Sequence, residues 1–203
     1  MNARDPDLEL VRELESDDPG RRRRALGRLY ERHHRRVFNV AWRVLGDWGL
    51  AQDVTQDVFL HLAERISSFR GEAGLTSWIY RITVNRAIDA RRREKRRPAW
   101  RMGDTPLEEV VRRPRGDPQP VDEPGVGIDQ DDRERRIQGA LGRLSPKLRA
   151  IVVLRYIEGL TYEQLAEVLG CARGTVKSRL NRAHAALQDV LEDPAPPDEE
   201  GRI

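Results

Sequence analysis

Hydrogen-bonding and cationic side chains follow a helical spacing near the end of this 203-residue chain. At about 100° per residue, Lys177, Ser178 and Asn181 share one side of a helix with Arg182 on its flank. The other side is apolar and predicts a buried stripe made of Val176, Leu180, Ala183 and Leu187. Short, basic, hydrogen-bonding groups suit contact with base edges in the major groove of DNA. The alternative is an ordinary amphipathic helix whose polar face is solvated.

The residues before this helix predict how it is positioned. Thr161 and Gln164 have the spacing of a capping box, which would begin a short helix. Ala166 is small enough for a close helix crossing, and Gly170 can adopt the left-handed conformation that ends a helix. Val176, ten residues after Ala166, would fill the inside of the corner. Together these residues predict a helix-turn-helix that binds DNA.

A second cationic group is the run RRREKRR at 91–97. Aromatic, amide and cationic side chains precede it around a glycine-containing loop: Phe69, Arg70, Trp78, Tyr80, Arg81 and Asn85. Stacking faces, base-edge hydrogen bonds and a cationic track are what single-stranded nucleic acid requires. Two plainer alternatives stay open, namely a solvated helix end for the run and core positions for Trp78 and Tyr80.

Composition excludes several other kinds of site. Formal net charge is only +3, so the case for a nucleic-acid partner depends on where the cations lie. A single cysteine rules out an internal disulfide, and the four histidines lack metal-ligand spacing. No glycine-rich phosphate loop, secretory leader or membrane-length apolar run occurs. We therefore expect a cytoplasmic protein that spans no membrane, binds no cofactor or metal and is not an enzyme.

Apolar residues recur at spacings of three and four, which predicts an all-α fold with helices near 8–15, 21–45, 51–66 and 75–95. Gly46 and Asp47 would end one helix and cap the next, and Ser145 with Pro146 would start another. Prolines and glycines crowd residues 98–127 and predict a flexible linker. The expected organisation is two small helical domains at 1–97 and 129–193, a linker at 98–128 and a disordered tail at 194–203.

Three segments resemble the extracytoplasmic-function sigma factors, the smallest members of the bacterial sigma-70 family. They are DVTQDVFLHL (53–62), FRGEAGLTSWIYRITVNRAIDARRR (69–93) and LTYEQLAEVLGCARGTVKSRLNRAHAAL (160–187). The resemblance covers about 22–97 and 130–190, which would be domains like sigma regions 2 and 4. It leaves no room for the extra domains of primary sigma factors. It implies a subunit that directs RNA polymerase to promoters and helps open the DNA.

The resemblance also implies roles for individual residues. Contacts with the β′ coiled coil of core RNA polymerase would come from Asp53, Gln56, Asp57 and Phe59. Contacts with melted DNA of the minus-ten element would come from Phe69, Arg70, Gly71, Trp78, Arg81 and Asn85, beside a basic track of Arg91, Arg92 and Arg93. Contacts with the duplex minus-thirty-five element would come from Arg155, Tyr162, Arg173, Lys177, Ser178, Asn181 and Arg182. The family is commonly inhibited by an anti-sigma factor, so such a partner is expected.

Two questions stay open at the level of sequence. A plain helix-turn-helix regulator that acts without polymerase would also explain 161–187, although it would need neither the polar strip at 53–57 nor the loop before Trp78. The arginines at 21–24 make that segment more basic than the family pattern. Two interpretations stay open: these arginines make an additional contact with DNA or polymerase, or they contact neither.

Overall fold

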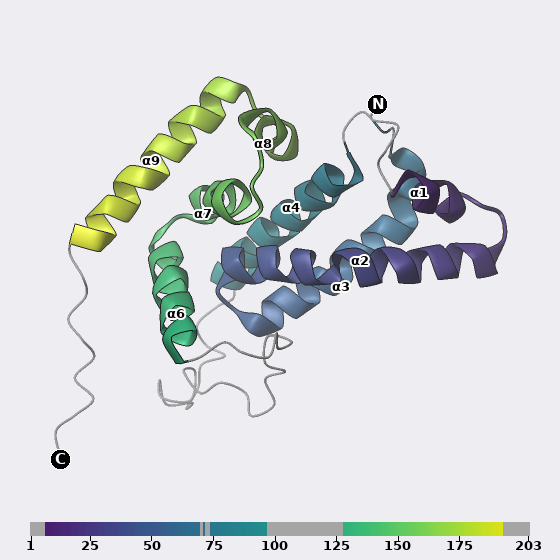
Figure 1. Ribbon diagram of the computed structural model, residues 1–203, viewed down its shortest axis with the longest axis horizontal. Helices are drawn as coiled ribbons and strands as arrows, with labels where there is room; N and C mark the ends of the chain where they lie inside the picture. The colour runs from purple at the N-terminus through teal and green to yellow at the C-terminus, as the bar shows by residue number, and fades with distance from the viewer. Residues whose placement is uncertain (1–6, 70, 72–73, 97–127, 193–203) are drawn as a thin grey trace, which may run out of the picture.

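A computed structural model describes residues 7–69, 71, 74–96 and 128–192 of the chain. All regular elements within these ranges are helical, which confirms the predicted fold class (Figure 1). The elements are α1 (Leu8–Leu14), α2 (Pro19–Leu45), α3 (Trp48–Arg65), η1 (Ile66–Ser68), α4 (Leu75–Lys95), α6 (Ile128–Arg143), α7 (Pro146–Val152), η3 (Val153–Ile157), α8 (Tyr162–Leu169) and α9 (Arg173–Glu192). The predicted tail and residues 98–127 of the predicted linker lie outside the described residues.

Local sequence signals set the helix ends. Gly46 ends α2 in the left-handed conformation, with φ of 70°, and Asp47 caps α3 by accepting a hydrogen bond from Leu50 N at 2.8 Å. Ser145 caps α7 through Leu148 N at 3.4 Å, and Pro146 occupies the first helical position. These stop and start signals are confirmed as predicted. α3 begins at Trp48, directly after its cap.

The N-terminal block, α1 to α4, is a bundle in which α2, α3 and α4 pack on one another and α1 lies along α2. Its core comes from residues three and four apart on each helix, as the periodicity predicted: Ala25, Leu29, Val37, Ala41, Val44, Val54, Val58, Leu62, Ile79 and Val84. Polar contacts hold α1, because Asp7 pairs with Arg32 and with the buried His33, and Glu13 pairs with Arg28. α1 therefore covers the middle of α2.

The C-terminal block, α6 to α9, contains the predicted helix-turn-helix. Thr161 Oγ1 accepts from Gln164 N at 3.3 Å, and Gln164 Oε1 accepts from Thr161 N at 2.8 Å, so both bonds of the capping box are present. Gly170 ends α8 with φ of 58°. Val176 is fully buried in the corner between α8 and α9. These local predictions are confirmed.

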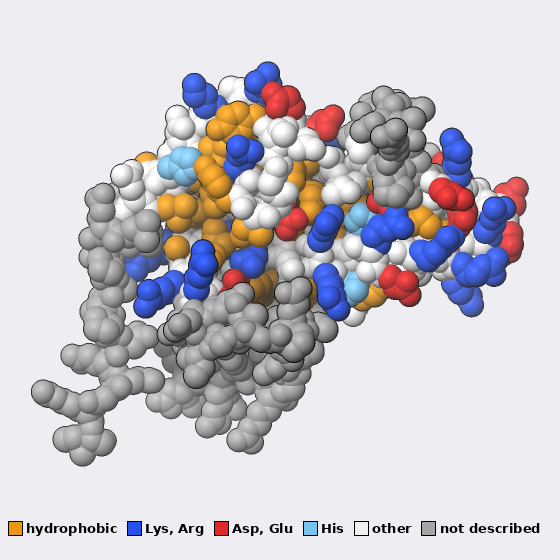
Figure 2. Space-filling view, viewed as in Figure 1, with side chains coloured by type: hydrophobic (Ala, Val, Ile, Leu, Met, Phe, Trp, Pro, Cys, Tyr) orange, Lys and Arg blue, Asp and Glu red, His pale blue; other side chains and the backbone are white. Residues whose placement is uncertain are grey.

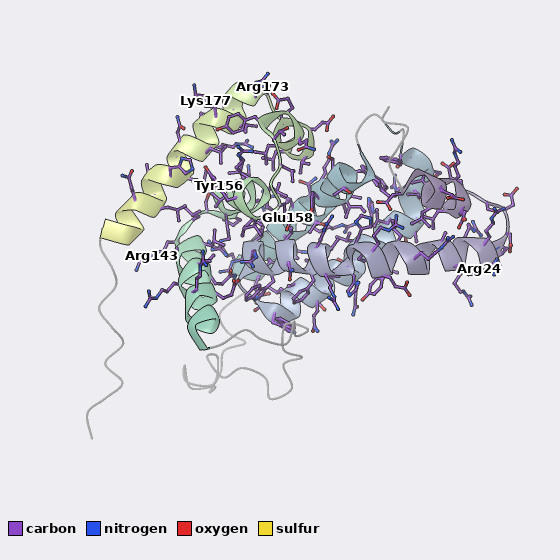
Figure 3. All side chains as sticks on the ribbon, viewed as in Figure 1. Arg24, Arg143, Tyr156, Glu158, Arg173 and Lys177 are labelled. Atoms are coloured by element: carbon purple, nitrogen blue, oxygen red, sulfur yellow. The ribbon has the colours of Figure 1, made fainter. Side chains whose placement is uncertain are left out.

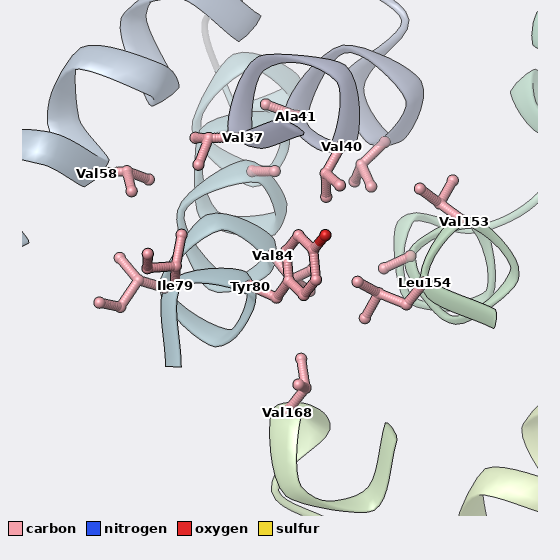
Figure 4. Close-up of a cluster of buried hydrophobic side chains, with 14 of the residues drawn as sticks. Val37, Val40, Ala41, Val58, Ile79, Tyr80, Val84, Val153, Leu154 and Val168 are labelled. Carbon is pink, nitrogen blue, oxygen red and sulfur yellow. The ribbon is translucent and has the colours of Figure 1, made fainter. Parts of the chain in front are cut away.

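The two blocks pack against each other, although no pattern in the sequence predicts this contact. α7 and η3 lie on α2, and α8 lies on α4. Figure 4 shows apolar side chains of both blocks in one buried cluster, with Val40, Tyr80 and Val84 facing Val153, Leu154 and Val168. The two blocks therefore share part of their hydrophobic core, and we call their contact the junction.

Polar side chains of the C-terminal block close the end of α2. Arg149 Nη1 donates to Val44 O at 2.9 Å, and Gln138 Nε2 donates to Trp42 O at 3.1 Å. The last carbonyls of a helix have no partner within it. Trp42 O also accepts from Gly46 N at 2.7 Å, whereas Val44 O receives its hydrogen bond from Arg149 across the junction. At the other side of the junction, the hydroxyl of Tyr80 donates to the carboxylate of Glu158.

The junction also contains groups that are poorly satisfied. Three buried side-chain atoms of the described residues lack a hydrogen-bond partner, and all belong to the junction: Arg43 Nε, Gln138 Oε1 and Arg149 Nε. Each such atom costs about 1–3 kcal/mol. Burial, and then repulsion by Arg91 of α4, lower the pKa of Arg149. Water would relieve these costs if the blocks separated, so they offset part of the stabilisation that burial of the apolar side chains provides.

Candidate nucleic-acid interface

The outward face of α9 carries every side chain predicted to contact the major groove. Lys177, Ser178, Asn181 and Arg182 are exposed, and Arg182 Nε donates to Ser178 O at 3.4 Å along the helix. The opposite side is buried through Val176, Leu180 and Ala183. In Figure 3, Lys177 and Arg173 extend away from the body of the protein. The burial pattern therefore leaves this face free to enter a groove.

Side chains around the start of the helix-turn-helix make an ion pair and a cation–π contact with one another. Arg173 Nη2 lies 2.9 Å from Glu163 Oε1, and both side chains are exposed. A hydrogen bond with its own backbone N–H, and then the charge of Arg173, lower the pKa of the Glu163 carboxyl. Arg155 is half-buried, donates to Leu160 O at 2.7 Å and lies over the ring of Tyr162, 5.2 Å from its centroid. Tyr162 is exposed beside it, so the two residues form one preformed surface.

The start of α4 brings together the predicted stacking residues. The rings of Phe69 and Trp78 are 5.3 Å apart and both are half-buried, so each keeps an accessible part. Arg81 and Asn85 are exposed one and two turns further along α4. Gly71 has φ of 67°, a conformation that favours glycine in this loop. The predicted site residue Arg70 lies outside the described residues.

Tyr80 does not offer a stacking face. Its side chain is only 4% exposed and lies in the junction, with its hydroxyl bonded to Glu158. Burial, and then that hydrogen bond, raise the pKa of Tyr80. The suggestion that Tyr80 stacks on a nucleic-acid base is therefore wrong for this arrangement, and the core alternative is correct. Helical periodicity did not distinguish the two, because the partner of Tyr80 is 78 positions away.

A groove between α3 and α4 joins Asn85 to the basic track. Its lining is polar and largely cationic: His61, Ile82, Asn85, Arg86, Asp89, Arg93 and Arg96. Arg86 Nη2 donates to His61 Nδ1 at 3.2 Å. Because arginine cannot accept, His61 must be neutral with its proton on Nε2. Burial first, and then Arg86 and Arg65, lower the pKa of His61, which agrees with this tautomer.

The sequence reasoning missed His61 and Arg86. They lie 25 residues apart on different helices, and their proximity depends on how α3 packs on α4. The three arginines of the predicted basic track do not share one environment. Arg92 and Arg93 are exposed, and Arg92 Nη1 lies 3.7 Å from Asp89 Oδ1. Arg91 is half-buried and lies toward Arg149. The groove side of α4 thus presents Arg93 and Arg96 rather than the whole run.

The predicted polar strip lies on the outer side of α3. Asp53 and Gln56 are exposed and Asp57 is half-buried. Phe59, by contrast, is 6% exposed and packs edge-on against Tyr30, with ring centroids 4.8 Å apart. Its burial does not suit a direct contact with a partner. One residue on, Leu60 is 64% exposed and continues the strip one turn beyond Gln56 and Asp57, so it is the apolar side chain that this face offers.

Two kinds of site are not found among the described residues. No group of three or more His, Cys, Asp or Glu side chains is placed to hold a metal ion. None of the helices in the described ranges combines the length and the apolar character needed to cross a membrane. What the described surface offers is a set of faces for binding: the α9 face, the start of α4 with its groove, and the α3 strip.

Family models match both blocks of the chain. Residues 29–97 match Sigma-70 region 2, and residues 134–187 match Sigma-70, region 4. The ECF RNA polymerase sigma factor SigM of Mycobacterium tuberculosis is 36% identical over 169 residues, covering 83% of this chain and 78% of the relative. The ECF RNA polymerase sigma factor SigE of Mycolicibacterium smegmatis is 37% identical over 164 residues, covering 80% of this chain; the match spans 60% of that relative's length.

A solved structure has a similar fold. It is the co-crystal structure of the sigma factor RpoE in complex with the anti-sigma factor NepR from Bartonella quintana. The match has a TM-score of 0.59 and 25% sequence identity, and covers 83% of this chain and 98% of the other.

Proposed function

We propose a division of labour within a chain that belongs to the extracytoplasmic-function sigma factors of the sigma-70 family, with regions 2 and 4 in its N-terminal and C-terminal blocks. Sigma factors are non-catalytic subunits of RNA polymerase, and this one directs promoter-specific initiation of transcription. The observation that supports the division of labour is that two separate surfaces, on α4 and on α9, each expose cationic and hydrogen-bonding side chains. A regulator that binds only duplex DNA needs one.

The C-terminal block would bind the duplex minus-thirty-five element. Its exposed cation Lys177 and the donors and acceptors of Ser178 and Asn181 suit base edges in the major groove. Arg173, Arg182 and the pair formed by Arg155 and Tyr162 would contact the flanking phosphates. Phosphate contacts fix the position of the helix, and base contacts select the sequence.

The N-terminal block would hold the minus-ten element once its bases are unpaired. The rings of Phe69 and Trp78 would support a base that has left the stack, and Asn85 would hydrogen-bond to a base edge. Gly71 and Arg70 belong to the same loop, and Arg81 with the exposed Arg92 and Arg93 would neutralise phosphates. Capture of unpaired bases would help open the DNA without a chemical step.

Core polymerase would bind the strip on α3, through its β′ coiled coil. Asp53, Gln56 and Asp57 supply polar contacts, and Leu60 supplies an apolar contact in place of the buried Phe59. An exposed leucine within a polar strip suits an interface whose centre must exclude water. The protein would act in the cytoplasm, where polymerase and promoter DNA are found.

The junction must open before both promoter elements are bound. Packed helices lie about 8–10 Å apart, and α8 packs directly on α4. By the positions that name them, the minus-thirty-five and minus-ten elements lie about 25 base pairs apart, which is about 85 Å of duplex at 3.4 Å per base pair. Residues 97–127 connect the blocks, and a chain of that length can span such a distance at about 3.3–3.6 Å per residue. The closed arrangement would therefore be a resting form.

An anti-sigma factor is a further expected partner. The similar RpoE structure is a complex with the anti-sigma factor NepR. A protein that binds both blocks in their closed arrangement would oppose opening by mass action, because it stabilises the form to which it binds. Inhibition would then require no contact with the α9 face.

Transcription with purified core polymerase tests the division of labour. The chain should direct initiation at a promoter that the core enzyme alone ignores. Combined Lys177→Ala and Arg182→Ala changes should abolish dependence on the minus-thirty-five element while leaving binding to core polymerase unchanged. Failure of the unmodified protein to co-elute with core polymerase would refute the polymerase role and favour a plain DNA-binding regulator. Loss of core binding in the double variant would contradict the separation of the two surfaces.

A further inference from the structure

An ion pair joins the two helices of the helix-turn-helix near their starts. Glu163 lies in the first turn of α8, and Arg173 is the first residue of α9. Arg173 Nη2 lies 2.9 Å from Glu163 Oε1. The proposed function gives the arginine a contact with a phosphate and leaves the carboxylate without a role.

Glu163 brings a negative charge to a surface that is otherwise cationic. Residues 168–188, which include the turn and the DNA-facing side of α9, contain no acidic residue. A carboxylate close to DNA repels its phosphates. The first turn of a helix suits an acidic side chain, and the carboxylate also bonds with its own backbone N–H. These local effects explain why an acid is stable at this position, but they do not explain its contact with α9.

Both members of the pair stay accessible to a partner. The side chains of Arg173 and Glu163 are 68% and 60% exposed. A guanidinium has five N–H donors on three nitrogens, and the ion pair engages one nitrogen, so other donors can meet a phosphate. Figure 3 shows Arg173 at the start of α9 beside α8, and Figure 2 shows basic and acidic side chains side by side at that end of the C-terminal block.

The other cations of α9 are held differently. Arg182 donates to Ser178 O, and Arg179 Nη1 lies 3.7 Å from Cys171 Sγ. Both acceptors are uncharged and leave the positive charge in place. In the described part of the chain, Arg173 is the cation of α9 that has a carboxylate partner. The start of α9 therefore meets DNA as a neutral pair.

A neutral, ordered pair affects two kinds of DNA binding differently. Binding to unrelated sequence depends mainly on the cations that neutralise phosphates, so cancelling one cation weakens it. Binding to the minus-thirty-five element also needs the guanidinium at one place, because phosphate contacts fix the position of the helix. A side chain that is already held loses less conformational freedom when it binds. The carboxylate thus disfavours unrelated DNA more than the specific element.

We propose that Glu163 is a positioning residue for Arg173 and raises the preference of the helix-turn-helix for its element over other DNA. It cancels one cation in sequence-independent binding, and it holds the guanidinium where a single phosphate meets it. This rests on the proposed function, which assigns Arg173 to a phosphate beside the minus-thirty-five element. Glu163 itself contacts no DNA group in this role.

Binding of the full chain to two duplexes tests the proposal. The specific duplex carries the upstream sequence that holoenzyme selects from a randomised segment, and the random duplex has the same base composition in shuffled order. Fluorescence anisotropy gives both dissociation constants over a series of salt concentrations. Glu163→Gln removes the charge and keeps the length of the side chain. Glu167→Gln is the control, because Glu167 is also exposed on α8, one turn further along.

Glu163→Gln leaves the charge of Arg173 uncompensated. On the random duplex the slope of log K against log salt should become steeper by about 0.9, which at about 0.1 M salt is about eightfold tighter binding. The specific duplex gains the same charge, but Arg173 must now be ordered on binding, which costs about two- to tenfold in affinity. Preference for the specific duplex should therefore fall about two- to tenfold. Glu167→Gln removes the same charge without releasing Arg173 and should keep the preference unchanged.

An Arg173→Gln background shows whether Glu163 acts through the arginine. Without a guanidinium to hold, adding Glu163→Gln should no longer lower the preference, since the effects of residues that act together are not additive. A fall in that background as large as the one seen with Arg173 present would overturn the proposal, because Glu163 would then act on DNA by itself.

Other results also overturn the proposal. Equal tightening on both duplexes by Glu163→Gln would show an effect of charge without positioning. An unchanged affinity for the random duplex would show that the pair does not meet DNA, and a lower melting temperature with the preference kept would make Glu163 only a stabiliser of α8. An equal fall in preference in Glu167→Gln would exclude a role for the ion pair. If holoenzyme selects no upstream sequence, or the unmodified chain binds both duplexes equally, the proposed function fails instead, and that result involves no change at Glu163.

Discussion

Removal of one hydroxyl at the junction should shift the protein toward its open form. Tyr80→Phe keeps the buried ring but deletes the hydrogen bond to Glu158. A hydrogen bond to a charged group contributes about 1.5–3 kcal/mol. Glu158 is only partly buried and regains water when its partner is lost, so we take the lower value. About 1.5 kcal/mol corresponds to about a tenfold increase in the ratio of open to closed molecules.

Energy transfer between dyes on the two blocks would report this shift. Cysteines introduced at Glu31 of α2 and Glu167 of α8, both exposed, carry the dyes in a Cys171→Ser background. Tyr80→Phe should reduce transfer. It should also raise the apparent affinity for core polymerase by up to about tenfold, because apparent affinity scales with the fraction of molecules that can bind.

Tyr30→Phe is the matched control. It removes the same hydroxyl from a ring of α2 that contacts His34 and Phe59 rather than the C-terminal block. Unchanged transfer in Tyr80→Phe, with polymerase affinity equal to that of the control, would refute the idea that this hydrogen bond holds a resting form. Reduced transfer without a gain in affinity would show that closure does not compete with polymerase.

Two further predictions concern single sites. Thr161→Ala removes the capping box of α8 and should lower the free energy of unfolding by about 1 kcal/mol, which lowers the melting temperature by about 2–4 °C. Circular dichroism measures the melting temperature, with Thr161→Ser as the control. An unchanged melting curve would mean that α8 does not depend on its cap. Arg86→Gln should raise the pKa of His61, though not fully to its ordinary value, because burial is the larger cause of the lowering. Because the pKa of His61 is lower in the folded protein than in the unfolded chain, protonation of His61 favours unfolding as the pH falls below about 6.5. The free energy of unfolding therefore decreases below that pH and is unaffected by His61 above it. The decrease should be smaller in the Arg86→Gln variant. NMR titration of the His61 ring follows the change, and an unaltered pKa would argue against the Arg86 contact.

Much of the architecture follows from interactions that are local in sequence. Apolar spacing of three and four residues predicted the helices, because the same period sets which side of a helix is buried. Gly46, Asp47, Ser145 and the Thr161 capping box fixed helix ends through neighbours three or four positions away. The exposed face of α9 followed from the same geometry, so the predicted side chains are all on the surface.

The sequence alone therefore determined the helices, their caps and the polar face of α9, since each depends on residues within a turn or two. Only the tertiary structure decided the closed junction, the burial of Phe59 and Tyr80 and the pairing of His61 with Arg86. Tyr80 meets Glu158 across 78 positions, and Arg149 reaches Val44 across 105. Contacts of that kind leave no periodic signal. They arise because two apolar surfaces, each unremarkable on its own helix, exclude water when they meet.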